Sequence, residues 1–146
     1  MNDMAETFMN GARYRRYMSG RFSSFCEAND LSAVDVKVLL FLEEHSGEEN
    51  RMSDIVRKEV INKGFISQSV MRLKKRGLLN LEEDKADRRV RHLSLTASSD
   101  PMVRVLRAMY EDTRTDIFSG VSREEKEVFF RVMRKISENL DKRQSE

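Results

Sequence analysis

Cysteine, proline and glycine are all scarce in this chain, and tryptophan does not occur. A single cysteine among 146 residues excludes an internal disulfide framework and fits a protein of the reducing cytoplasm. One proline and six glycines disfavour a β-sandwich or a β-barrel, because those folds need many turn residues. We therefore expect a mainly helical fold.

Long hydrophobic runs are also missing. The longest extends from Val38 to Leu42, far short of the roughly 20 residues that span a bilayer as a helix. The N-terminus carries the acids Asp3 and Glu6 and no apolar core segment, which is not the pattern of a signal peptide. We expect no membrane partner and a location in the cytoplasm.

The residue patterns of catalysis and metal binding are absent as well. The sequence has no glycine-rich phosphate loop and no plausible set of nucleophile, histidine and acid, which argues against an enzyme. Its two histidines, His45 and His92, are too few for a dedicated four-ligand zinc site. No cofactor is expected.

Charge is abundant and unevenly distributed. Residues 57–91 contain 11 Lys and Arg against 5 Asp and Glu, so this segment has a net charge of +6 and the rest of the chain −4. A basic centre on a weakly acidic scaffold is typical of a module that binds a polyanion. A solvated helical face would give the same count, so charge alone leaves both interpretations open.

Hydrophobic periodicity predicts helices for both ends of the chain. Apolar residues recur at steps of three and four over about residues 4–28, which predicts a long amphipathic helix. Ser32 and Asp35 have the spacing of a capping box for the next helix. Near the C-terminus we expect a helix over about 101–118 and a final helix capped by Ser122.

The middle of the chain has a different pattern. A short helix, capped by Ser53 and ending near Lys58, is followed by a turn and a longer helix over Lys63–Arg76 that Asn62 caps. Ile66, Val70 and Leu73 form its one buried stripe. Two candidate strands, 78–81 and 90–95, then enclose a polar tip. A helix-turn-helix followed by such a hairpin is a winged helix.

Four short motifs in this region carry a resemblance. They are Met-Ser-Asp-Ile-Val at 52–56, Ile-Ser-Gln-Ser-Val at 66–70, Arg-Leu-Lys-Lys-Arg-Gly-Leu-Leu at 72–79 and Asp-Arg-Arg at 87–89, with Leu95-Thr96 after them. This stretch resembles the DNA-binding core of the MarR family of bacterial winged helix-turn-helix transcription regulators. Leu81 departs from the family pattern, which often has a basic residue there.

The resemblance implies a mainly α fold with a small β-hairpin wing, arranged as a single MarR-like domain over residues 1–146. Residues 32–96 would form the winged helix-turn-helix core, and residues 1–30 and 100–142 the long terminal helices of a dimerisation region. It also implies a homodimer. Terminal helices rich in Phe, Met and Tyr would expose more apolar surface than one small domain can cover, and a partner subunit can cover it.

By the same resemblance, the helix over residues 63–76 lies in the major groove of double-stranded DNA. We expect Gln68 to read a base, because its amide can bond N6 and N7 of adenine together, although a solvated Gln68 is the alternative. Ser67 and Ser69 are secondary contacts to base or phosphate. Residues expected to favour or hold phosphates are Asn62, Lys63, Arg72, Lys74 and Lys75.

The wing is expected to contact the minor groove. The resemblance places Arg89 at its tip, where a narrow A·T-rich groove concentrates negative potential. Asp87 is expected to orient Arg89 through a charge-assisted bond, and Arg88 to contact a phosphate or the same groove. His92 is expected to face solvent or DNA.

Two further expectations concern the first helix. Many MarR-family members bind small aromatic effectors between the dimer helices and the winged lobe, and the candidate lining residues here are Tyr14, Tyr17, Met18 and Phe22. The same stripe at helical spacing is also the pattern of a dimer core. Cys26 lies beside aromatic residues and is expected to be a buried small hydrophobe instead of a redox sensor.

Together these features predict a sequence-specific double-stranded DNA-binding transcriptional regulator. By resemblance it would be a repressor, acting as a homodimer on a pseudo-palindromic operator and released by a small-molecule effector in the cytoplasm of a bacterium or archaeon. The alternative is a winged-helix protein-interaction module that does not read DNA sequence, which the acidic residues Glu82, Glu83 and Asp84 keep open.

Overall fold

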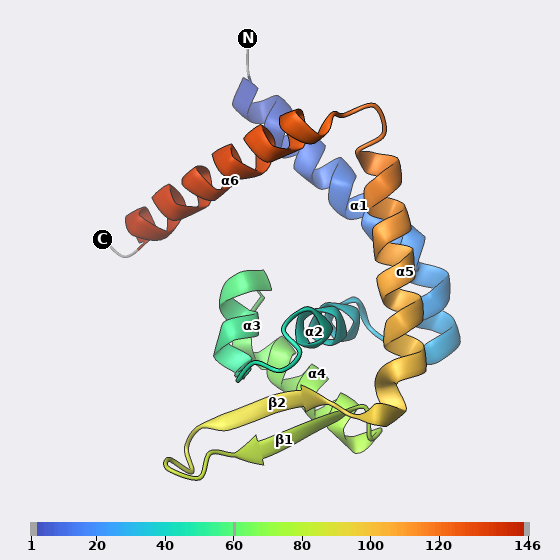
Figure 1. Ribbon diagram of the computed structural model, residues 1–146, viewed down its shortest axis with the longest axis vertical. Coiled ribbons are helices and arrows are strands. Elements are labelled where there is room, and N and C mark those ends of the chain that lie inside the picture. The colour runs from blue at the N-terminus through green and yellow to red at the C-terminus, as the bar shows by residue number, and fades with distance from the viewer. Residues whose placement is uncertain (1–2, 60, 145–146) are drawn as a thin grey trace. The chain divides into compact units, whose positions relative to one another are not determined.

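The computed structural model describes residues 3–59 and 61–144, with side chains from residue 10 onward (Figure 1). Residues 1–2 and 145–146 of the predicted domain, and Val60 in the predicted turn between two helices, lie outside the described residues. The chain divides into two compact units, the first ending at Thr113 and the second beginning at Arg114. Each unit is described by itself.

Helices make up most of both units, as the composition predicts. The first unit contains α1 (Asp3–Asn29), α2 (Ala33–Glu44), α3 (Met52–Glu59), α4 (Lys63–Lys75), β1 (Leu79–Glu83), β2 (Arg91–Leu95), the 3₁₀ turn η1 (Ala97–Ser99) and most of α5 (Asp100–Ile117). The second contains the last residues of α5 and α6 (Arg123–Gln144). The predicted mainly α fold with a small β-hairpin is confirmed.

Several helix starts follow from local sequence. Ser32 and Asp35 form the predicted capping box, with the Ser32 backbone N donating to Asp35 Oδ2 at 2.8 Å and the Asp35 backbone N donating to Ser32 Oγ at 3.1 Å. Ser122 begins α6 in the same way. The prediction that Ser53 caps α3 is wrong. That helix begins at Met52, so Ser53 lies inside its first turn, and the Asp54 carboxylate accepts the backbone N–H of Arg51 at 2.9 Å.

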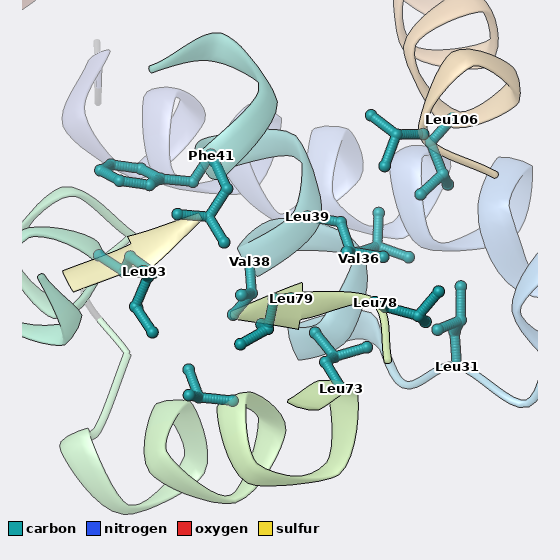
Figure 2. Packing of buried hydrophobic residues seen from close by; sticks show 14 of the residues in the cluster. Leu31, Val36, Val38, Leu39, Phe41, Leu73, Leu78, Leu79, Leu93 and Leu106 are labelled. Carbon is teal, nitrogen blue, oxygen red and sulfur yellow. The ribbon is translucent and has the colours of Figure 1, made fainter. Parts of the chain in front are cut away.

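The core of the first unit is built around α2, which is apolar on most of its circumference. It contacts α1, α3, α4 and β2, and Figure 2 shows its side chains among those of α4, the hairpin and α5. Fully buried residues from these elements are Val38, Leu39, Ile55, Ile66, Val70, Leu73 and Leu106. Burying one such side chain stabilises the fold by about 1.5–3 kcal/mol, so this cluster fixes the helices relative to one another.

The hairpin is attached to this core by its base. β1 and β2 pair antiparallel with Leu79 opposite Leu95 and Leu81 opposite Leu93, and the Leu79 and Leu93 side chains are buried. The backbone N–H of Leu93 also donates to Asn50 O at 2.7 Å, which ties β2 to the loop before α3. The far end of the hairpin extends away from the core (Figure 1). A rigid base therefore carries a protruding tip.

The second unit consists of an aromatic cluster and an exposed apolar face. Phe118 has ring contacts with Phe129 and Phe130, at centroid distances of 6.2 Å and 5.5 Å. No described residue of α6 is buried. Large apolar side chains of α6 that are more than two-fifths exposed are Val128, Phe129, Val132, Met133, Ile136 and Leu140.

Candidate nucleic-acid interface

The outward face of α4 is polar and basic. Asn62 caps the helix as predicted, because its Oδ1 accepts the backbone N–H of Gly64 at 2.8 Å. The predicted buried stripe is confirmed, since Ile66, Val70 and Leu73 have no exposed surface. Predicted contact residues that α4 does expose are Lys63, Gln68, Arg72, Lys74 and Lys75, with Ser67 half-buried. Because α4 contains no acid, its charged residues are all basic, with Lys63 at the start and Arg72, Lys74 and Lys75 in the last turn.

Ser69 does not lie on this face. It is completely buried, and its Oγ donates to Oδ1 of the buried Asp35 at 2.6 Å. The interpretation of Ser69 as an outward residue is therefore wrong. Its angular position on α4 is next to the apolar stripe, and a carboxylate on α2 supplies the hydrogen-bond partner that a buried hydroxyl requires.

Arg72 is held by the same carboxylate. Its Nη2 donates to Asp35 Oδ1 at 2.6 Å and to Ser32 Oγ at 3.0 Å, and its Nε donates to Asp35 Oδ2 at 3.2 Å. Burial raises the pKa of Asp35, but the bonds from Arg72, the Ser32 backbone and Ser69 outweigh it and hold that pKa below its usual value. Arg72, expected as a phosphate contact, thus joins α4 to the start of α2 with its guanidinium already engaged.

A second arginine at the end of α4 has a similar role. Nη1 of Arg76 donates to the carbonyl O of Asp30 at 2.7 Å, and Nη2 donates to that of Asn29 at 2.8 Å. These carbonyls belong to the last residue of α1 and the first residue after it. We name the contacts of Arg72 and Arg76 with Asp35, Ser32, Asn29 and Asp30 the α4 clamp. It could not be found from charge patterning, because its acceptors lie about forty residues away in sequence.

The wing tip carries the predicted pair of charged residues. The Arg89 guanidinium contacts Asp87, with Nε to Oδ1 at 3.2 Å, and the Arg89 backbone N–H donates to the same oxygen at 3.0 Å. The Arg89 side chain is nevertheless 92% exposed. Arg88 is exposed too and has no hydrogen-bond or ion-pair partner among the described residues. The tip therefore presents two guanidinium groups to solvent, one of them oriented by Asp87.

Asp84 shapes the turn below this tip. Its Oδ1 accepts the backbone N–H groups of Ala86 and Asp87 at 2.7 Å and 3.0 Å, and its Oδ2 contacts Nε2 of His92 at 2.8 Å. The bond with His92 and those with the two backbone groups lower the pKa of Asp84 to about 2. The expectation that His92 faces solvent or DNA is wrong, because its half-buried ring contacts Asp84 across the hairpin. Asp84 is thus a structural acid of the wing.

Sequence reasoning missed Phe65. This residue lies in the first turn of α4, on the outward side, and is 61% exposed. Met71 on the same helix is 49% exposed. The residues expected on the outward face were all polar. Phe65 could have been found because it lies outside the Ile66–Val70–Leu73 stripe and so cannot share its burial.

The four residues of the predicted effector pocket do not surround a common hollow. Phe22 is part of the core and only 7% exposed, Met18 packs against that core, and Tyr14 and Tyr17 are more than two-fifths exposed. A hollow of about 650 Å³ occurs elsewhere in the first unit, between the end of α2, β2 and α5, and none of the four residues lines it. Of the four, Phe22 is the one that packs within the core, so Tyr14, Tyr17 and Met18 have the more accessible side chains.

Cys26 is half-buried and packs against the core, and burial raises the pKa of its thiol. In the part of the chain that the structure describes, no three His, Cys, Asp or Glu side chains gather as metal ligands would. Within those same residues, no helix combines the length and the apolar character needed to cross a bilayer.

Comparison with known proteins agrees with this arrangement. Residues 31–99 match the family of winged helix DNA-binding domains. MepR of Staphylococcus aureus in its DNA-binding conformation superimposes with a TM-score of 0.83 at 18% identity, over 92% of this chain and 98% of that one. A MarR-family regulator from Silicibacter pomeroyi gives a TM-score of 0.80 at 18% identity, over 92% and 88%.

BpsR of Bordetella bronchiseptica, whose DNA binding is regulated by 6-hydroxynicotinic acid, is 25% identical over 87% of this chain and 91% of that one, with a TM-score of 0.63. The helix-turn-helix, the hairpin and the family match define a winged helix DNA-binding fold. More specifically, the chain has the transcription-regulator fold of the MarR type, which confirms the resemblance carried by the four motifs.

Proposed function

We propose that this protein is a sequence-specific double-stranded DNA-binding transcription regulator that acts as a homodimer. The observation that carries the proposal is the pairing, within one winged helix, of an acid-free outward face on α4 with a wing tip that exposes Arg88 and Arg89. MepR, which shares the fold at a TM-score of 0.74 in that structure, has been solved in complex with DNA. Its place of action would be the DNA of a bacterial or archaeal cytoplasm.

Helix α4 would enter the major groove. Gln68 is exposed near its middle and can bond an adenine edge with its amide, and Ser67 beside it can bond base or phosphate. Lys63, Lys74 and Lys75 would contact phosphates, which add affinity but little sequence information. The positive end of the α4 dipole, which begins after Asn62, would favour a phosphate there. Ser69 and Arg72 are not among the contacts, because Asp35 engages both.

The wing would contact the flanking minor groove. Arg89 is exposed, and its contact with Asp87 biases the direction of the guanidinium before it binds. A narrow groove attracts such a guanidinium because its negative potential is enhanced there. Arg88 would contact a phosphate nearby. Specificity would then combine direct reading by α4 with shape reading by the wing.

Dimerisation is supported by the apolar face of α6. Val128, Val132 and Ile136 recur every four residues and are all more than two-fifths exposed. An exposed stripe of this length marks an interaction surface, and a second copy is the partner that a symmetric, two-lobed DNA reader needs. We propose residues 1–30 and 100–142 as the dimerisation region and residues 32–96 as the DNA-binding core.

Repression and release by an effector complete the proposal. BpsR provides the analogy, since its DNA binding is regulated by 6-hydroxynicotinic acid. In this chain Tyr14, Tyr17 and Met18 have ring or thioether surface available for an aromatic ligand. An aromatic acid that binds them would raise the melting temperature of the free protein and lower its affinity for the operator.

Selection from a random duplex pool at ~150 mM salt tests the DNA-binding function, because this salt suppresses non-specific phosphate binding. We expect an enriched pseudo-palindrome with half-sites about 10 bp apart. Binding without enrichment would overturn sequence-specific reading and favour the protein-interaction module.

Sedimentation of the purified chain tests the dimer. We expect a dimer for the natural chain and a monomer for Val132→Glu, because a carboxylate within an apolar interface cannot be solvated. Lys135→Glu places the same charge on α6 at an exposed polar position and should leave the dimer intact. Equal behaviour of the two variants would contradict an interface through the apolar stripe.

A further inference from the structure

The ring of Phe65 is the most exposed large hydrophobic side chain among the described residues, at 61%. It lies three positions after the capping Asn62, in the half of α4 that a helix-turn-helix directs at base edges. Nothing in the first unit covers it. An exposed aromatic ring at this place needs an explanation, because solvation of its surface is unfavourable.

The residues around Phe65 indicate which kind of binding partner the ring would contact. Lys63 precedes it by two residues, Gln68 follows by three, and the whole helix lacks acids. Neighbouring α4 positions with apolar side chains, Ile66 and Val70, are buried and offer no continuation of an apolar patch. A protein partner would need such a patch. The other exposed apolar side chain of α4, Met71, lies six residues further along the helix and does not adjoin Phe65. An isolated apolar group on a helix whose charged residues are all basic instead fits a polyanion that carries isolated apolar groups.

Duplex DNA has this character. The major groove displays hydrogen-bond donors and acceptors and one apolar feature, the 5-methyl group of thymine. Residues three apart on a helix lie about 4.5 Å apart along its axis, nearer to the rise of one base-pair step, about 3.4 Å, than to that of two. A ring at Phe65 and an amide at Gln68 therefore face adjacent base pairs once α4 lies in the groove.

We propose that Phe65 is a specificity-determining residue that contacts the 5-methyl group of a thymine in each half-site, next to the base pair that Gln68 faces. The proposal rests on the proposed function, because it requires α4 to lie in the major groove. It adds to that function the identity of one base, a thymine, and the apolar residue that selects it, Phe65. Removal of one methyl group from that contact should weaken binding about four-fold per half-site, or about fifteen-fold for a dimer.

The test replaces thymine by deoxyuridine, which removes the methyl group and leaves the Watson–Crick edge unchanged. Each thymine of the selected operator is replaced in turn, symmetrically in both half-sites, and affinity is measured by fluorescence anisotropy. We expect one position at which deoxyuridine weakens the natural chain about fifteen-fold. At that position Phe65→Ala should bind thymine and deoxyuridine equally, whereas Phe65→Leu should retain part of the preference.

Met71→Ala is the matched control, since it also shortens an exposed apolar side chain of α4 and should keep the full deoxyuridine penalty. Three outcomes would overturn the proposal: no thymine whose methyl group matters to the natural chain, an equal penalty in the natural chain and Phe65→Ala, or an operator without thymine. Failure to select any operator would instead refute the proposed function itself. Because the deoxyuridine series uses the unaltered protein, the proposal can fail even if a variant does not fold.

Discussion

Four arginines of one basic stretch are used in two different ways. Arg72 and Arg76, at the end of α4, turn toward the protein and bond Asp35 and the carbonyl groups before α2. Arg88 and Arg89, at the wing tip, turn toward solvent, and Arg89 contacts Asp87. All four side chains carry the same charge, but those of Arg72 and Arg76 donate more hydrogen bonds to protein groups than those of Arg88 and Arg89.

The difference shows that a count of positive charges overstates a DNA-binding surface. A guanidinium already bonded to a buried carboxylate must give up those bonds before it can bind a phosphate, whereas an exposed one gives up only water. Binding should therefore depend on the wing arginines and the free lysines, and folding on the α4 clamp. The following predictions would break or sharpen this division.

The largest effect is expected at the wing. Arg89→Ala should weaken binding to the selected operator at least about thirty-fold, because each subunit of a dimer loses a groove contact of about 1–3 kcal/mol. Thermal unfolding should be almost unchanged, since the side chain is 92% exposed. Arg123→Ala, which removes an exposed arginine from the second unit, is the control and should bind normally. A similar loss in both variants would argue against a contact specific to the wing.

The α4 clamp should give the opposite result. Asp35→Asn should lower the free energy of unfolding by about 2 kcal/mol, a figure kept small because the Arg72 side chain is 45% exposed. The folded pKa of Asp35 lies below its usual 3.8, so its stabilising effect is present above about pH 4 and is lost as the pH falls further.

Asp87→Asn is the matched substitution in the wing. Its ion pair is exposed, so urea unfolding should show a loss well below 1 kcal/mol. Equal losses for Asp35→Asn and Asp87→Asn would mean that burial of the α2 carboxylate does not make its contacts stronger.

Much of the fold is predictable because it depends on local rules. The capping boxes at Ser32 and Ser122, the Asn62 cap and the Ile66–Val70–Leu73 stripe all follow from residues within a few positions of one another. Gly77 ends α4 with a φ of 72°, a conformation that glycine adopts without strain, as its place after the helix suggests. Residues close together in the sequence are therefore sufficient to predict these elements.

The candidate site is less predictable because it depends on tertiary contacts. Asp35 is recognisable as a capping residue, but nothing near it in sequence shows that Ser69 and Arg72 arrive from α4. Asp84 looks like one of three surface acids until the hairpin brings His92 to it. Distance in sequence hides such partners, and burial decides which of them matter.

Salt dependence should separate free cations from clamped ones. The four cations proposed as phosphate contacts in each subunit, Lys63, Lys74, Lys75 and Arg88, would neutralise about eight phosphates in a dimer and give a log–log slope near −7. Lys75→Ala should reduce that slope by about 2, because two contacts are lost.

Arg72→Gln should leave the slope unchanged, because its guanidinium contacts Asp35 and no phosphate. Titrations between 50 and 300 mM salt, at a temperature where circular dichroism shows both variants folded, make the comparison. A slope reduced equally by both substitutions would show that Arg72 leaves the clamp when DNA binds.

The smallest effect concerns the wing turn. The pKa of Asp84 is lowered to about 2 from 3.8, so the carboxylate stabilises the turn above pH 3.8 and loses that effect as the pH falls toward 2. The amide resonances of Ala86 and Asp87, which donate to it, should therefore stay in their neutral-pH positions at pH 4 and shift only below. In Asp84→Asn these shifts should disappear. Glu82→Gln, on the preceding strand β1, should keep them, because the Glu82 carboxylate has no hydrogen bond among the described residues. If the wing tip loses its order when Asp84 is replaced, Arg89 will be positioned less well for the minor groove. A modest loss of operator affinity in Asp84→Asn would therefore show that Asp84 supports the position of Arg89.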